Sequence, residues 1–252
     1  MPNDMNWRTD LLEKQHWMTF LLPFLVYMLV GALEPTSTKA GGEAIGLSIP
    51  YAYYPWLYAG KIALTLASIA FVWPGYRKFP FHVSKTAIVA GIIGGPLWIV
   101  LCRLDIEHQY LLPILKSLRC EWLLGTRSAF NPFEQLEGPT AAWAFLAARF
   151  LGLVAVVPLI EEFFLRGFVM RFVVDRDWWD VPFGKVNALA IALGTIFPVL
   201  SHPEWTAAAV WFSLITWLMV RTRNIWDCVA AHAITNLILG IYVVASENWR
   251  LM

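Results

Sequence analysis

The feature that most constrains this chain is a repeated pattern of long apolar runs. A helix of about 20 apolar residues crosses a bilayer core about 30 Å thick, and runs of that kind recur along the whole sequence. They cover residues 17–33, 53–73, 86–104, 140–174, 186–200, 205–220 and 225–245. We therefore predict an all-α fold, a polytopic bundle of seven transmembrane helices, with eight as the alternative count.

The composition agrees with a membrane protein. The chain is 58% hydrophobic and 15% charged, whereas soluble domains are usually about 45 to 50% apolar. Residues 1–16 carry charges of both signs, and no small-residue cleavage site follows the first run, so we interpret that run as a span and not as a signal peptide. No repeat or linker is visible, which predicts one membrane domain over residues 1–252. Membrane lipid is the expected surrounding, and a net charge of +1 gives no reason to propose nucleic acid as a partner.

Lysine and arginine in short loops set the orientation of a membrane protein. Every second loop of this chain is basic, through Arg8, Lys14, Arg77, Lys78, Lys85, Arg171, Arg176, Lys185, Arg221 and Arg223. The alternate loops hold fewer basic residues, namely Lys39, Arg250 and, in the long loop after the third span, Lys116, Arg119 and Arg127. With seven spans, this pattern predicts a cytoplasmic N-terminus and a C-terminus outside the cytoplasm. We expect the bacterial inner (plasma) membrane.

Other segments fit the surfaces of such a bundle. Apolar residues recur at helical spacing over 111–122, which predicts an amphipathic helix lying in the membrane interface. The polar stretch 125–140 is expected to be a surface loop. Aromatic clusters at 51–58 and 178–179, together with Trp205, are typical of interfacial anchors. We interpret Lys61 and Asp227 as ordinary snorkelling or helix-end charges.

Ionisable residues concentrate in the fourth apolar run, where they are costly and usually mark function. Glu161, Glu162 and Arg166 lie within otherwise apolar sequence. Glu162 and Arg166 are four residues apart and share a helix face, whereas Glu161 projects about 100° away. Glu162 is therefore the expected ion-pair partner of Arg166. Glu161 is left as the carboxylate that takes a proton, the role of a general base.

Two histidines follow in later apolar segments. His202 ends one run, and His232 lies four residues before Asn236, so His232 and Asn236 point the same way on a helix. A carboxylate and a histidine can activate water, while a second histidine and an amide can stabilise the oxyanion of a tetrahedral intermediate. These groups suffice for peptide hydrolysis without a nucleophilic serine or cysteine.

The three blocks resemble the signature of the CAAX prenyl endopeptidase and bacteriocin-processing (CPBP) family, which includes type II CAAX prenyl proteases. The resemblance extends over a catalytic core at about 154–244. It implies an intramembrane endopeptidase in which Glu161 and His202 activate water and His232 and Asn236 form the oxyanion hole. The remaining site residues, Glu162 and Arg166, would support the site. One position departs from the family pattern, because Pro198 occupies the place where phenylalanine usually precedes the histidine by four residues.

Other readings remain open. A divalent metal such as zinc is a possible cofactor of an imidazole and carboxylate site, although this spacing is not diagnostic. The polar cluster could instead specify helix packing in an inactive scaffold or immunity-type protein. A small transporter would need a polar path to both faces, and the first three spans offer little polar lining. As substrate we expect a membrane-anchored peptide or protein.

The position of His202 raises a geometric problem. Counted from residue 186, it lies about 24 Å along its helix, near the face opposite to the helix start, whereas Glu161 lies near mid-membrane. We therefore predict that the segment 197–204 is broken by Pro198 and Pro203 and folds inward. His202 would then share a water with Glu161 in a cavity that opens to the cytoplasm.

Overall fold

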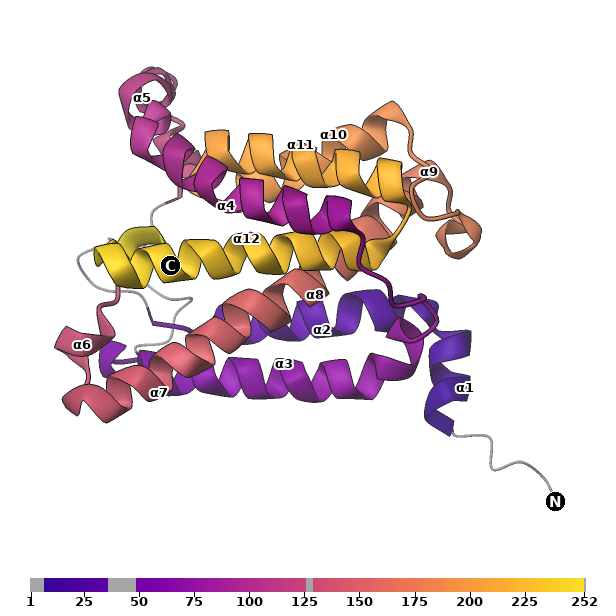
Figure 1. Ribbon diagram of the computed structural model, residues 1–252, viewed down its shortest axis with the longest axis horizontal. Coiled ribbons are helices and arrows are strands. Elements are labelled where there is room, and N and C mark those ends of the chain that lie inside the picture. Colours follow the sequence, from indigo (N-terminus) through magenta and orange to yellow (C-terminus); the bar gives the residue numbers. More distant parts are fainter. Residues whose placement is uncertain (1–6, 36–48, 126–128, 252) are drawn as a thin grey trace.

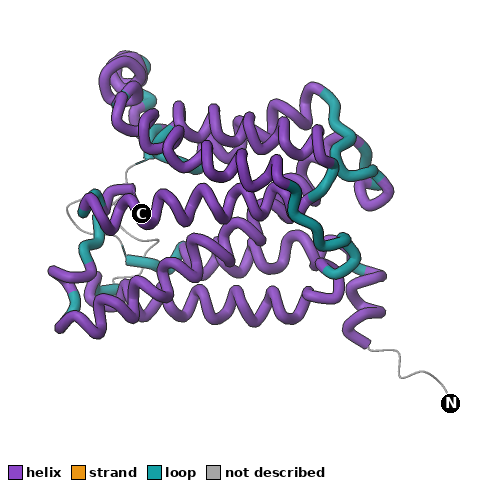
Figure 2. The backbone as a smooth tube through the Cα atoms, in the orientation of Figure 1, coloured by secondary structure: helices purple, strands orange, loops and turns teal. Residues whose placement is uncertain are grey.

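The protein is built from helices and the loops between them. The computed structural model describes residues 7–35, 49–125 and 129–251, and within these ranges it contains no strand (Figure 2). The predicted all-α fold is confirmed. Two basic residues used for the orientation, Lys39 and Arg127, lie outside the described residues, as do positions 126–128 of the predicted surface loop. The rest of that loop contains the short helix α6 (Pro132–Gln135), and α7 (Gly138–Phe150) begins before the loop was expected to end.

Four helical stretches of the described chain are long and apolar enough to cross a membrane. They are Tyr51–Tyr76, Lys85–Ser117, Gly138–Val174 and Ile225–Ser246. The other three predicted spans correspond to shorter helices. These are α2 (His16–Gly31), α10 (Ala188–Leu200) and α11 (Trp205–Thr222), with 16, 13 and 18 residues. The chain is an integral membrane protein with four clear candidate spans.

The central helix of the bundle is α12 (Ile225–Ser246), which lies between α4 (Lys85–Leu104) and the run that contains α7 and α8 (Val157–Glu162) (Figure 1). Small residues let α4 approach it closely. A Cβ added to Gly91 or Gly95 would lie 2.7 Å or 2.6 Å from the side chain of an isoleucine on α12. Such small-xxx-small spacing is a common device of membrane helix pairs. It fixes the position of the helix that carries His232 and Asn236.

The predicted interfacial helix is interrupted. A π-helical segment, η3 (Glu107–Leu111), leads into α5 (Leu112–Ser117), and η4 (Glu121–Leu123) follows as a single 3₁₀ turn. At the end of α5, Arg119 adopts a φ of 54° and the Cys120 N–H donates to the Leu115 carbonyl at 2.8 Å. This is the hydrogen-bond pattern of a Schellman motif. The helix therefore stops at Ser117 and does not continue to 122.

Asp227 is not an ordinary helix-end charge, which corrects the sequence-based interpretation. Its side chain is buried, and its two carboxylate oxygens accept hydrogen bonds from the Ser84 N–H and the Ser84 hydroxyl, each at 2.8 Å. Ser84 also caps α4, because its hydroxyl oxygen accepts from the Ala87 N–H. One carboxylate thus ties the start of α12 to the start of α4.

The half-buried tryptophans at 178–179, predicted as interfacial anchors, also pack against a neighbouring helix. Their rings meet Phe20 of α2 at centroid distances of 5.1 Å and 5.8 Å. Arg171 holds this loop by donating to the carbonyls of Val181 and Trp179. The aromatic contacts join α2 to the end of the helical run that carries the site.

Candidate active site

The two adjacent glutamates lie on α8 (Val157–Glu162), a short α-helical turn between two π-helical segments. η5 (Leu151–Val156) precedes it and η6 (Phe163–Val169) follows it. Wider π turns inside a long helix are frequent at functional sites, because they re-aim side chains without breaking the helix. The carboxylates therefore lie where the fourth apolar run departs most from a regular α-helix.

The expected pair between Glu162 and Arg166 forms and is completely enclosed. Arg166 Nη1 lies 3.2 Å from Glu162 Oε1 and 3.1 Å from Oε2, and neither side chain is exposed to solvent. The guanidinium also lies 5.3 Å from the centroid of the Phe212 ring and donates from Nη2 to the Phe212 carbonyl at 3.5 Å. The pair connects α8 and η6 to α11.

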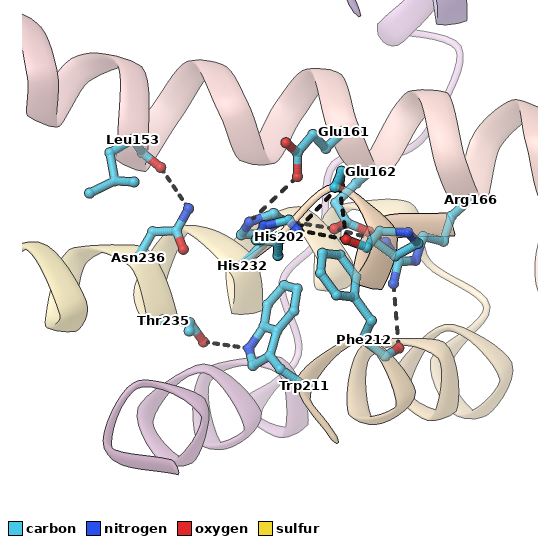
Figure 3. Close-up of polar contacts among 12 residues, drawn as sticks. Leu153, Glu161, Glu162, Arg166, His202, Trp211, Phe212, His232, Thr235 and Asn236 are labelled. Carbon is cyan, nitrogen blue, oxygen red and sulfur yellow. Dashed lines mark hydrogen bonds and ion pairs between the residues drawn. The ribbon is translucent and has the colours of Figure 1, made fainter. Parts of the chain in front are cut away.

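Glu162 also contacts His232, a contact that the sequence did not predict. His232 Nδ1 lies 2.9 Å from Glu162 Oε1, as Figure 3 shows. A carboxylate only accepts, so Nδ1 carries the proton and Nε2 is the nitrogen directed away from Glu162. Nε2 lies 4.0 Å from Glu161 Oε2. The edge-to-face packing of the ring on Trp211, with centroids 4.5 Å apart, fixes its plane.

Glu161 faces a cavity of about 440 Å³ that His202, His232 and Asn236 also line. Its side chain is 26% exposed, in contrast to the fully enclosed Glu162. The division expected from the helix geometry is therefore present, because one carboxylate is held in an ion pair and the other meets the cavity.

His202 reaches the cavity by a simpler route than predicted. Pro198 does not break the helix, because α10 continues through it to Leu200, and only then does the chain turn. The helix begins at Ala188, so His202 lies about 21 Å from its start, slightly less than the predicted distance. His202 Nδ1 lies 2.7 Å from the Pro198 carbonyl oxygen, so Nδ1 is the donor in this hydrogen bond.

The Asn236 side chain forms a hydrogen bond that compensates for a missing backbone donor. Its Nδ2 donates to the Leu153 carbonyl at 2.9 Å (Figure 3). In η5 the Val157 N–H donates to the carbonyl of Gly152, five residues earlier. In the same pattern the next residue, Pro158, would donate to the Leu153 carbonyl. Proline has no N–H, and the Asn236 amide supplies the missing donor. This bond uses one N–H of the amide and orients the other.

The far end of the same cavity contains polar residues that the sequence reading missed. Tyr27, Glu34, Tyr54, Tyr58, Lys61 and Arg149 line it. Lys61 is buried and pairs with Glu34 at 2.8 Å, so it does not snorkel. Tyr54 and Tyr58, which belong to a cluster predicted as interfacial anchors, also line the cavity. The expectation that the first three spans have little polar lining is therefore wrong. Lys61 in mid-span and Arg149 in an apolar run were the available signals.

The direction of the cavity also differs from the prediction. Gly31, Glu34, Pro35 and Tyr54 line it, and they mark the end of the bundle where α2 ends and α3 (Tyr54–Tyr76) begins. The basic cluster that includes Arg77 and Lys85 lies at the opposite end of α3 and α4. In the predicted orientation the basic end is cytoplasmic. The lining residues thus extend toward the other face.

The described residues contain no group of three or more histidine, cysteine, aspartate or glutamate side chains arranged to hold a metal ion. The contacts of Glu162 explain this, since it is engaged by Arg166 and His232 together. The donor set does not fit the divalent metal considered from the sequence, and no step below depends on one.

Comparison with known proteins gave one match. Residues 142–238 match the family model described as type II CAAX prenyl endopeptidase Rce1-like, which confirms the resemblance seen in the three sequence blocks. The match contains all six candidate site residues. No curated protein and no solved structure matches the chain.

Proposed function

We propose that this membrane protein acts as a peptide hydrolase, on the premise that residues 142–238 match the model of the type II CAAX prenyl endopeptidase Rce1-like family. It hydrolyses a peptide bond of a membrane-associated protein or peptide, using water activated by Glu161 and His202. The observation that carries this proposal is the convergence of Glu161, His202, His232 and Asn236 on one cavity.

The first step is attack by water on the scissile carbonyl. His202 Nε2, an acceptor when the ring is neutral and Nδ1 donates to Pro198, positions the water, and Glu161 accepts its proton. A tetrahedral intermediate forms with the negative charge on the former carbonyl oxygen. Glu161 then returns the proton to the leaving amine as the carbon–nitrogen bond breaks, which restores the carboxylate. General acid–base catalysis of this kind contributes about 10²- to 10⁴-fold.

The second element is the oxyanion hole. The Asn236 amide has a second N–H beyond the one given to Leu153. His232 donates from Nε2 only when the ring carries two protons, because Nδ1 is already protonated toward Glu162. The imidazolium would lie between Glu162 and Glu161. The negative charges of these two carboxylates would then balance the positive charges of the imidazolium and of Arg166. We therefore assign His232 as the cationic donor and Glu162 and Arg166 as the groups that position it.

The rival functions lack equivalent support. A scaffold would use the buried Glu162–Arg166 pair to fix helix packing. It would not need a cavity that is also lined by Glu161 and His202. A transporter needs polar lining to both faces. Within the described residues, the polar lining of this cavity extends from Glu161 toward the end of the bundle near Glu34.

We further propose seven spans, with α2, α10 and α11 completing the bundle and the N-terminus in the cytoplasm of a bacterial cell. The short lengths of α2 and α10 favour a locally thinned bilayer, because a helix shorter than the hydrocarbon core is accommodated by thinning at modest cost. The basic residues grouped at one end support this orientation.

The direct test is Glu161→Gln, which keeps the side-chain volume and removes the base. Purified wild type in micelles is expected to cleave members of a set of membrane-anchored peptides, and the variant should be slower by about 10²- to 10⁴-fold. Glu134→Gln, an exposed carboxylate on α6 outside the cavity, is the matched control and should retain activity. Normal cleavage by Glu161→Gln would refute the mechanism.

A further inference from the structure

A second cavity, of about 340 Å³, lies beside the start of α2, whereas the first cavity reaches the end of that helix near Gly31. It forms where α1 (Trp7–Lys14) meets α2, together with the loop that follows α9 (Met170–Val174), and both lie at the same end of the bundle (Figure 1). No residue lines both cavities. We call the second one the interfacial cavity, and the proposed hydrolysis does not use it.

The interfacial cavity lies at the level where the chain enters the membrane. Helix α1 carries charges of both signs, whereas α2, from His16 to Gly31, contains no lysine, arginine, aspartate or glutamate. Trp17 stands at this boundary, is 43% exposed and lines the cavity. Tryptophan at a boundary between charged and apolar sequence is typical of the headgroup region of a bilayer. The headgroup of a neighbouring lipid is therefore the ligand nearest to the cavity.

Trp179 forms a fixed wall of the interfacial cavity. Its ring stacks on that of His16, with centroids 3.9 Å apart and an interplanar angle of 4°, and it meets Phe20 edge-on. Its carbonyl accepts a hydrogen bond from Arg171, which also donates to the Gly167 carbonyl at 3.2 Å and so joins the loop to η6. Contacts within the protein hold this wall in place, and a preformed site loses less conformational entropy when it binds a ligand.

The charged side chains of the interfacial cavity are two cations and two carboxylates. Lys14 and Arg176 supply the positive charges, and Asp177 and Asp180 supply the negative charges. The Arg176 guanidinium forms no ion pair with the described residues, and Lys14 has an exposed contact with Asp10 at 3.5 Å. A purely anionic ligand would meet the repulsion of two carboxylates, and a purely cationic ligand that of two basic groups. A ligand with one charge of each sign fits this lining.

We propose that the interfacial cavity binds a zwitterionic lipid headgroup that contains a phosphate and a primary ammonium, as in phosphatidylethanolamine. The planar guanidinium of Arg176 suits two oxygens of the phosphate. The three N–H donors of the ammonium suit the carboxylates of Asp177 and Asp180. This combination makes the site selective for one class of headgroup and does not involve the residues assigned to peptide hydrolysis.

Two other phospholipids each lack part of this match. Phosphatidylcholine carries the same two charges, but its trimethylammonium has no N–H to donate to a carboxylate. Phosphatidylglycerol has the phosphate and no cation. The acyl chains of all three would lie along α2, where Leu25, Met28 and Leu29 are exposed. Comparing the three lipids therefore separates recognition of the headgroup from adsorption of the apolar chains.

The test measures binding of the dihexanoyl forms of the three lipids to the purified full-length protein in neutral detergent, by isothermal titration calorimetry. Phosphatidylethanolamine is expected to bind about tenfold more tightly than the other two, the ratio expected for one charge-assisted hydrogen bond. Arg176→Gln should weaken its binding by about tenfold. The double variant Asp177→Asn, Asp180→Asn should bind it no better than phosphatidylcholine. The matched control is Arg221→Gln, an exposed arginine at the basic end of α11 that does not line the cavity, and it should bind as wild type does.

Equal affinity of the wild type for all three lipids would overturn the proposal, and so would binding that Arg176→Gln leaves unchanged. Tighter binding of phosphatidylglycerol would overturn it in favour of an anion site. Glycerophosphoethanolamine, the same headgroup without acyl chains, should bind more weakly by about tenfold or more, because it buries no apolar chain. Its binding as tightly as the lipid would overturn the lipid assignment in favour of a soluble compound. Cleavage is not measured in any of these assays, so their outcomes are independent of the proposed hydrolysis.

Discussion

An arginine lies near each end of the cavity, and the two arginines differ in the kind of partner that each contacts. At the end near Glu161, Arg166 is enclosed with Glu162, which also meets His232, so each charge has a partner built into the protein. At the far end, Arg149 contacts the hydroxyl of Tyr54 and the ring of Tyr58, and no carboxylate of the described residues pairs with it. The charge of the first arginine is thus balanced within the protein, whereas the second is held by tyrosines alone.

The largest effect should come from breaking the enclosed pair. Arg166→Met leaves the Glu162 carboxylate buried without its cation, and Glu162→Gln leaves the guanidinium unbalanced. Each should lower the free energy of unfolding by roughly 3 to 5 kcal/mol. The double variant should lose less than the sum, because no unpaired charge remains. Denaturant titration in mixed micelles measures this, and single variants as stable as wild type would show that the pair contributes nothing.

The next effect concerns the carbonyl that Pro158 leaves without a donor. Asn236→Ala removes the amide that serves Leu153 and should cost about 1 to 3 kcal/mol of stability. Combining it with Pro158→Ala restores a backbone N–H to the helix and should recover much of that loss. Peptide cleavage should not recover, because the oxyanion donor is still absent. Recovery of both stability and cleavage would reduce Asn236 to a structural role.

The smallest effect on stability is expected at the far end. Arg149→Met loses one hydrogen bond and one cation–π contact, each worth about 1 kcal/mol, but it also removes a cation that the described residues leave without a carboxylate. The free energy of unfolding should change by no more than about 1 kcal/mol, measured beside Arg166→Met in the same micelles. A loss of stability as large as that of Arg166→Met would show that the two arginines contribute equally to the free energy of unfolding.

Local sequence rules were reliable where neighbours along one helix decide the outcome. The apolar runs predicted an all-α membrane protein, and the four-residue spacing predicted the Glu162–Arg166 pair, because residues four apart always share a helix face. The number of spans was less secure. Helices α2 and α10 are shorter than a bilayer normally requires, and a hydropathy pattern does not specify where a helix begins or ends within an apolar run.

Contacts between helices were beyond the sequence. The bond from Glu162 to His232 and the convergence of His202 on the cavity join residues far apart in the chain. Lys61 and Asp227 were misread for the same reason, since a lone charge in an apolar run gives no sign of whether a partner such as Glu34 or Ser84 will meet it.

The sequence by itself determined the all-α class of fold, the family resemblance of residues 142–238 and the Glu162–Arg166 pair, because these depend on apolar length, on residue type and on spacing within single helices. Only the tertiary structure decided that Glu162 also meets His232, which nitrogen of His232 faces the cavity and which end of the bundle the cavity approaches. Those properties depend on the packing of α12 between α4 and the π-interrupted helix, and packing distances are set by side chains from different helices.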